Sequence, residues 1–245
     1  MVHTAPIQKF ALDLLRSYFE TYGLKGLEDI RDMIYPILHE RAQSKFWIIE
    51  YSTWMNMYQY AELMGPDFHR YYADTFEVDR GLRQLLYTMD RLRQDYRYKD
   101  DGSIHQREIL LIVLGKILQV LFEHLENAPT DGYIIGQTRV WLEAMPIRFE
   151  RKLSCESHRF LCQLATKFPN VVLGDKDDQL KTALASILAI YRSEYTERDI
   201  DQLIVGIFDS LHKQQRLQKV STALENSLPA EDKPKLKQIL ESLKT

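Results

Sequence analysis

The chain has 245 residues, of which 45% are hydrophobic, 27% charged and 11% aromatic, with a formal net charge of −3. This apolar content predicts a sizeable core, excludes a disordered chain and leaves room for one large domain or two ordinary ones. The ten glycines and eight prolines are too few for the turns of a β-sandwich or barrel, and the small net charge argues against nucleic-acid binding over the whole surface.

The first half of the chain has a helical period. Residues 6–22 place seven apolar side chains at i, i+3, i+4 and i+7 spacing, and Gly23 follows as a helix stop signal. Residues 27–42 repeat this pattern, and Pro36 within them predicts a kink. The apolar residues are Ile7, Phe10, Ala11, Leu14, Leu15, Tyr18 and Phe19 in the first segment, and Leu27, Ile30, Met33, Ile34, Ile37 and Leu38 in the second. The same reasoning predicts further helices over 44–64, 67–76, 79–98 and 104–126.

The second half continues in the same way, and no run of residues shows the alternation of a strand. Helices are predicted over 130–145, 153–167, 178–195, 196–226 (with a break near Lys213) and 230–244. We therefore expect an all-α protein. Its antiparallel helix pairs could stack as a HEAT-like α-solenoid or close into a single globular bundle. Most aromatic and methionine positions, including Trp54, Met55 and Met57, are predicted to be core.

Cysteine usage and hydropathy indicate the compartment. The two cysteines, Cys155 and Cys162, lie two turns apart on one side of a predicted helix. This predicts small buried hydrophobic residues rather than a disulfide framework, and an intracellular location. The most apolar stretch, 109–122, is interrupted by Lys116 and Gln119, so we expect no membrane insertion.

Signatures of catalysis are missing from the sequence. It contains no nucleophile elbow, phosphate-binding loop, dinucleotide-binding fingerprint or helical zinc motif. Glu62, His69 and Asp74 could bring carboxylates and an imidazole together for a metal pair, but Gly65-Pro66 breaks the helix between the first two. We therefore expect no catalytic residue, no cofactor and no metal, and predict that the protein is not an enzyme.

A segment from Arg80 to Lys99 combines basic and aromatic side chains. Such a combination is typical of single-stranded RNA binding, although interspersed aspartates also fit a solvated helix face or a surface for an acidic protein. The candidate partner-binding residues are Arg80, Arg83, Arg91, Arg93, Tyr96, Arg97, Tyr98 and Lys99.

Three segments carry a family resemblance. Residues 141–147 read WLEAMPI, 158–174 read HRFLCQLATKFPNVVLG, and the tail from Leu228 reads LPAEDKPKLKQILESL, while 114–117 read LGKI. In this order and spacing they resemble the C-terminal HEAT-repeat region of the karyopherin-β (importin) nuclear transport receptors, over about residues 110–244. The matching positions are Trp141, Leu142, Pro146, Leu161, Cys162, Val172, Leu173, Gly174, Leu228 and Glu231.

The resemblance implies HEAT-like repeats over 103–245, preceded by an unrecognised helical region over 1–102. It also implies a protein-binding module similar to the cargo-binding part of an importin, acting in nuclear protein transport in the cytoplasm, the nucleus or both. Cargo proteins or the subunits of a complex are the expected partners. The repeats with which the family binds the Ran GTPase have no counterpart here, so we expect this chain alone not to bind Ran. The alternatives are an RNA-binding helical protein and a structural or accessory subunit of a larger complex.

Overall fold

The computed structural model describes residues 5–41, 44, 47–65, 67, 101–123, 125, 127, 132–148 and 150–243. Every regular element within these ranges is a helix, which confirms the prediction of an all-α protein. The helices predicted over 67–76 and 79–98 fall on residues that, apart from Asp67, lie outside the described ranges.

The chain divides into two compact units, Met1–His124 and Leu125–Thr245. The division between residues 102 and 103, into an unrecognised helical region and HEAT-like repeats, stays a prediction. The helix that starts at Asp101 belongs to the first unit and packs against the helix that ends at Met64.

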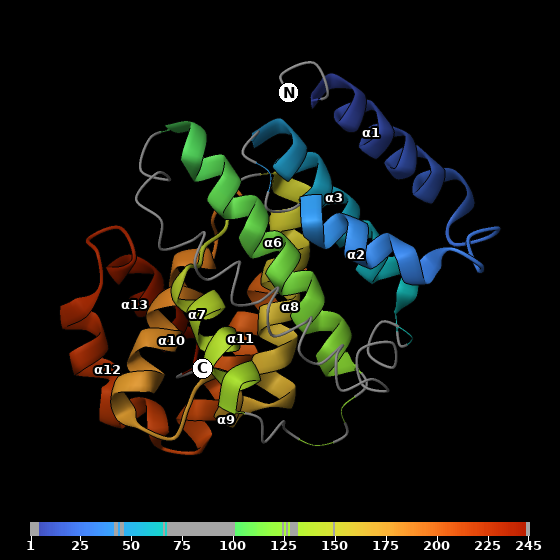
Figure 1. Ribbon diagram of the computed structural model, residues 1–245. Coiled ribbons are helices and arrows are strands. Elements are labelled where there is room, and N and C mark those ends of the chain that lie inside the picture. The colour runs from blue at the N-terminus through green and yellow to red at the C-terminus, as the bar shows by residue number, and fades with distance from the viewer. Residues whose placement is uncertain are drawn as a thin grey trace. The chain divides into compact units, whose positions relative to one another are not determined.

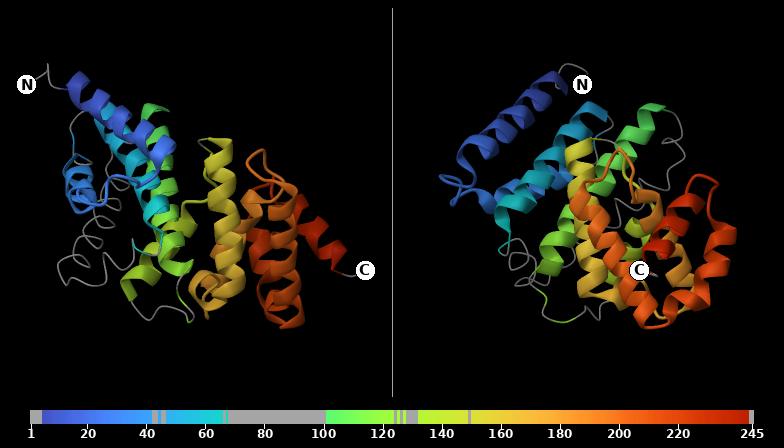
Figure 2. Two further views of the ribbon diagram at one scale, coloured as in Figure 1. Left: turned by 90° about the vertical axis from the view of Figure 1, so that its right-hand side faces the viewer. Right: turned by 180° about the vertical axis from the view of Figure 1, so that it is seen from behind.

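The first unit is organised around one helix that is buried on most sides. Its described helices are α1 (Ala5–Tyr22), α2 (Arg31–Arg41), α3 (Trp47–Met64) and α6 (Asp101–Glu123). Helix α3 packs against each of the other three and lies between α1 and α6 (Figures 1 and 2). Its side chains are apolar around most of its circumference, as expected for a helix with neighbours on several sides. Trp54, Met55 and Met57 are all buried, which confirms their assignment to the core.

The end of α1 follows the sequence signal. The backbone N–H of Gly23 donates to the carbonyl of Phe19 at 3.0 Å, and Gly23 has a φ of 62°. A glycine adopts this left-handed conformation without the steric cost of a Cβ atom, so it ends the helix and turns the chain toward α2.

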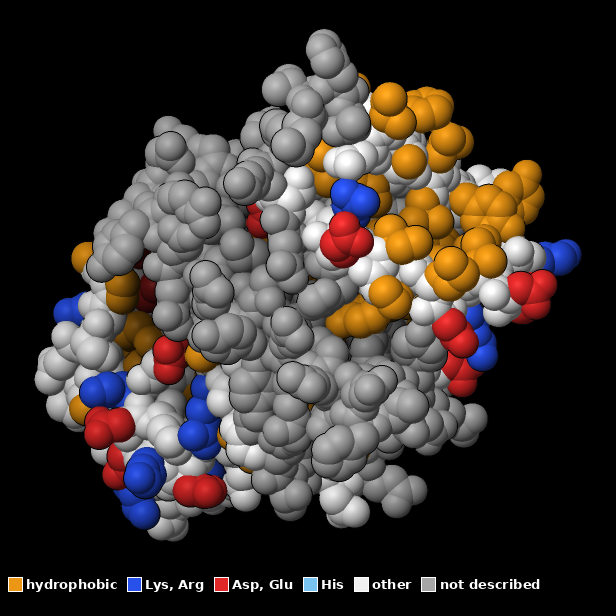
Figure 3. All heavy atoms as spheres, in the orientation of Figure 1, with side chains coloured by type: hydrophobic (Ala, Val, Ile, Leu, Met, Phe, Trp, Pro, Cys, Tyr) orange, Lys and Arg blue, Asp and Glu red, His pale blue; other side chains and the backbone are white. Residues whose placement is uncertain are grey.

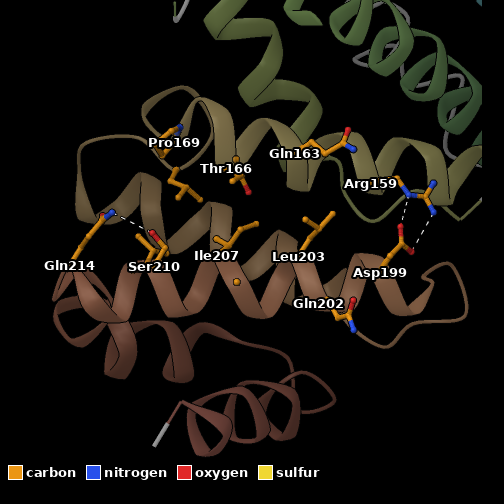
Figure 4. A pocket seen from close by; sticks show the side chains of 14 residues that line it. Arg159, Gln163, Thr166, Pro169, Asp199, Gln202, Leu203, Ile207, Ser210 and Gln214 are labelled. Atoms are coloured by element: carbon orange, nitrogen blue, oxygen red, sulfur yellow. Dashed lines mark hydrogen bonds and ion pairs between the residues drawn. The ribbon is translucent and has the colours of Figure 1, made fainter. Parts of the chain in front are cut away.

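The second unit contains seven described helices. They are α7 (Gly132–Glu143), α8 (Arg151–Lys167), α9 (Pro169–Val172), α10 (Asp177–Ile190), α11 (Arg198–Lys213), α12 (Arg216–Ser227) and α13 (Lys233–Ser242). Helix α8 packs against α11, while α10 packs against α7 and α12. Helices α8 and α11 run in the same direction, because Arg159 and Asp199 meet near one end and Thr166 and Ser210 lie toward the other (Figure 4).

Helix boundaries in this unit differ from the sequence prediction where the backbone becomes left-handed. The helix predicted over 178–195 ends at Ile190, since Tyr191 leaves the helical region with a ψ of 125° and Arg192 has a φ of 51°. The predicted break near Lys213 is confirmed, and Gln215, with a φ of 58°, separates α11 from α12.

The core of this unit includes three residues of α8. Leu161 is fully buried, together with Cys155 and Cys162, and both cysteines are free thiols. The Sγ atom of Cys155 lies 3.2 Å from the carbonyl oxygen of Tyr195. Both cysteines therefore pack as small core residues, as the sequence predicts.

Candidate protein-binding surfaces

Large apolar side chains are exposed on one part of the first unit. Ile7, Phe10 and Met33 have exposed fractions of 69%, 65% and 61%. Figure 3 shows hydrophobic side chains gathered over α1 and α2 on this face. We call this the α1–α2 surface, and it comprises Ile7, Phe10, Leu14, Tyr22, Ile30, Met33 and Ile37.

Helix α1 exposes these residues because its apolar side chains extend beyond the side that packs on α3. Leu12 and Phe19 are buried there, and Asn56 donates from Nδ2 to the carbonyl of Leu12 at 3.0 Å. The spacing of Ile7, Phe10 and Leu14 places them on another side of the helix. Of the seven apolar residues predicted for residues 6–22, Phe19 is the one that is buried, and four are exposed. The buried side of α1 also contains Leu12, which was not among the seven.

Helix α2 is divided in the same way. Ile34 and Leu38 are buried, whereas Met33 and Ile37 are exposed, each pair being one helical turn apart. Packing on α3 requires apolar side chains on one side of α2 only. The exposed pair therefore lies outside that contact.

Charged residues of α1 occupy a separate stripe. Lys9 pairs with Asp13, and Arg16 Nε donates to Glu20 Oε1 at 3.0 Å, both at i, i+4 spacing. The apolar residues of the α1–α2 surface are thus bordered by paired charges, the arrangement of an interface with an apolar centre and a polar rim.

The second unit carries a groove with a volume of about 660 Å³ between α8 and α11, which we call the α8–α11 groove (Figure 4). Its apolar residues are Ala165, Leu173, Leu203, Ile207 and Leu211, together with Pro169 at the start of α9. Its polar uncharged residues are Gln163, Thr166, Gln202, Ser210 and Gln214.

One end of this groove is closed by an ion-pair cluster. Arg159 donates from Nε to Asp199 at 2.7 Å and from Nη2 to Glu197 at 2.6 Å. The hydrogen bond from Arg159 holds the pKa of Asp199 below its usual value, and the pKa of Arg159 is correspondingly raised. Both carboxylate side chains remain 53% exposed. The cluster contains two carboxylates and one guanidinium, so it has a net negative charge.

The candidate partner-binding residues of the sequence analysis, from Arg80 to Lys99, lie outside the described residues. Their role in binding RNA or an acidic protein stays a prediction.

The weak metal constellation is only partly within the described ranges. Glu62 accepts a hydrogen bond from Lys116 Nζ at 3.1 Å, and Lys116 also lies over the ring of Tyr58. His69 and Asp74 are outside the described residues. Among the residues that the structure describes, no group of three or more His, Cys, Asp or Glu side chains is placed to hold a metal ion.

The residues that carry the importin resemblance are mainly core residues. Six of them in the segment 141–173 and Leu228 are buried, and Gly174 has a φ of 67°. The six are Trp141, Leu142, Leu161, Cys162, Val172 and Leu173. Glu231 is exposed and Pro146 is half-buried. These positions therefore account for packing and a tight turn, and they do not form a binding site.

Comparison with protein-family models, curated protein sequences and solved structures finds no match for this chain. None of the helices in the described part of the chain combines the length and the hydrophobicity needed to cross a bilayer. The α1–α2 surface and the α8–α11 groove are thus the features from which a function must be inferred.

Proposed function

We propose that the protein is a non-enzymatic helical module that binds another protein through the α1–α2 surface. The observation that carries this proposal is the exposure of seven large apolar side chains, each by at least 47%. Contiguous apolar areas of this kind are uncommon on monomeric soluble proteins and mark sites of association.

The energetic argument is that a partner would remove this surface from water. Burial of apolar surface contributes about 25 cal/mol per Å². Phe10 and Met33 supply large, adaptable contact areas of the kind enriched at the centres of interfaces. The proposed partner surface is accordingly apolar at its centre, with polar groups facing the paired charges of α1.

The arrangement of the second unit supports a more specific form of the proposal. Helix α8 packs against α11, and α10 packs against α7 and α12, so helices that are not consecutive in the chain contact each other. Contacts of this kind also occur in stacks of helix pairs, in which each pair buries its apolar side against the next. We propose that this unit is a short HEAT-like stack, related to the C-terminal part of an importin. Nuclear protein transport within the cytoplasm or nucleus is then the proposed process.

The test begins with affinity capture from cell extract, using the wild-type chain and the double variant Phe10→Gln/Met33→Gln. A captured protein is then purified and its dissociation constant for each form of the chain is measured. Replacing two highly exposed apolar side chains of the surface is expected to weaken binding by at least about tenfold. The control variant Arg16→Gln/Glu20→Gln changes the charged stripe of α1 instead, and we expect it to bind within about threefold of the wild type.

Two further arms separate the alternatives. The wild-type chain is titrated into fluorescently labelled poly(U) RNA at increasing salt concentrations, and capture is repeated with GTP-loaded Ran added. Tight, salt-dependent RNA binding with no protein partner would overturn the proposal in favour of an RNA-binding protein. Equal affinity of the wild type and the Phe10/Met33 variant would also contradict it.

A further inference from the structure

The α8–α11 groove is depleted of charge. Of the 14 residues that line it, Arg159 and Asp199 are the two that carry a charge, although 27% of the whole chain is charged. Both lie at the same end of the groove (Figure 4). Loss of charged residues from the centre of a surface distinguishes binding interfaces from ordinary solvated faces.

Helix α11 presents an uncharged stripe along this groove. Gln202, Gly206 and Ser210 of α11, and Gln214 directly after it, recur every four residues, and all four are exposed. A Cβ atom added to Gly206 would have no atom within 4 Å. This glycine therefore leaves open space along the wall of the groove, where the backbone of another molecule can approach closely.

The walls of the groove favour a helix over an extended segment. Both walls are helices, whose backbone N–H and C=O groups are bonded internally, so they offer no strand edge. An extended peptide would leave its own backbone groups unpaired above Leu203 and Ile207. A helix satisfies its own backbone and needs only an apolar stripe that matches the groove.

We propose that the α8–α11 groove binds an amphipathic helix of a partner protein, with its apolar stripe on Leu203 and Ile207 and a basic residue beside Asp199. The basic residue follows from charge complementarity, because Glu197 and Asp199 outnumber the one guanidinium of Arg159. This proposal goes beyond the function proposed above, since it concerns a different surface on a different unit.

The probe is a yeast-displayed library of helical peptides of about 16 residues, the length of α11, with aliphatic residues at i, i+3, i+4 and i+7 and all other positions randomised. The library is selected against the purified 245-residue chain. Recovered peptides are synthesised, and fluorescence anisotropy gives their dissociation constants. We expect the recovered sequences to be enriched in Lys or Arg at one end.

Two variants locate the binding site. Gly206→Leu fills the open space and is expected to weaken binding by at least about tenfold, because it displaces the peptide backbone. Asp199→Asn removes one carboxylate and is expected to weaken binding about two- to fivefold, the effect of an exposed ion pair.

Matched controls exclude a general loss of structure. Gly136→Leu introduces the same side chain on α7, at another glycine with no atom within 4 Å of its Cβ position. Asp178→Asn removes an exposed carboxylate from α10. Both controls should bind the peptides as the wild type does, and circular dichroism should show equal helicity in all variants.

Three results would overturn the inference. The first is that no helical peptide is recovered, and the second is that recovered peptides bind Gly206→Leu as tightly as the wild type. The third is that light scattering detects a dimer that Gly206→Leu dissociates, which would assign the groove to a second copy of the chain. These results concern the second unit, whereas the α1–α2 surface belongs to the first.

Discussion

The Nε2 atom of His158 accepts a hydrogen bond from the backbone N–H of Ile147, at 3.1 Å. Because this nitrogen accepts, the proton of the neutral ring is on Nδ1, which donates to the carbonyl of Tyr195 at 2.9 Å. These two hydrogen bonds connect α8 to Ile147, which precedes this helix, and to Tyr195, which follows α10. Burial lowers the pKa of His158 from 6.5 to about 4, outweighing the opposing effect of the bond to Tyr195.

Because its pKa is lowered in the folded protein, His158 should make the stability of the protein depend on pH. Above about pH 6.5 the ring is neutral in both the folded and the unfolded chain, so its contribution is fully present. As the pH falls from 6.5 to about 4, the unfolded chain binds a proton that the native state does not, and the free energy of unfolding decreases by up to about 3 kcal/mol. Urea titrations between pH 4 and 8 measure this decrease.

The variant His158→Gln should lose that component of the pH dependence, whatever its absolute stability. His212→Gln controls for removing an imidazole from α11. A wild-type stability that stays level between pH 6.5 and 4 would contradict the assigned role of His158.

Glycine substitutions should have opposite effects at two positions. Gly174 has a φ of 67°, and a Cβ atom there would lie 2.6 Å from Cβ of Gln179, so Gly174→Ala should destabilise by about 2 kcal/mol or more. Gly206 lies in a helix with open space around it, so Gly206→Ala should stabilise by about 0.5–1 kcal/mol. Thermal and urea unfolding of both variants measure the two changes. A stabilised Gly174→Ala variant would show that the turn at 174 is wrongly described.

Leucine-to-alanine substitutions should lower the free energy of unfolding much more at a core position than on the α1–α2 surface. Leu161 is fully buried, so Leu161→Ala should cost about 2–5 kcal/mol. Leu14 is exposed on α1, so Leu14→Ala should cost less than about 0.5 kcal/mol. Equal losses in chemical denaturation would mean that the exposed side of α1 is covered within the chain.

The two thiols should be unreactive in the folded protein. Burial raises the pKa of Cys162 to about 12 and also raises that of Cys155, which leaves little thiolate at pH 8. We expect negligible reaction with 5,5′-dithiobis(2-nitrobenzoic acid) in native buffer and reaction of both thiols in urea. Fast labelling of either native thiol would place it at the surface instead.

The helix content was predictable from the sequence because apolar spacing and stop signals are local. Gly23 and the break near Lys213 were found in this way. Helix α9 was not, because Pro169 was treated only as the end of the preceding helix, whereas proline also fits the first position of a new one. The buried position of His158 was predictable from the spacing. Counted from Cys155, His158 lies at i+3 and Leu161 at i+6, and all three are on the buried side of α8.

The candidate surfaces were less accessible to sequence reasoning. The apolar residues of α1 extend around more than one side, and spacing alone does not say which side packs on α3. The groove joins residues of α8 and α11 that are about forty positions apart in the chain, and the four-residue spacing of its polar residues on α11 is equally typical of a solvated helix face. Its one local signal is Gly206, a glycine within a strongly amphipathic helix.

The most direct test of the account is photo-crosslinking from the α1–α2 surface in cells. p-Benzoylphenylalanine is placed at Phe10 or Met33, which are exposed, and at Arg16 as a control in the charged stripe. The account predicts that both apolar positions crosslink to the same second protein and that Arg16 does so much less. Crosslinks confined to this chain itself, or equal yields from all three positions, would contradict it.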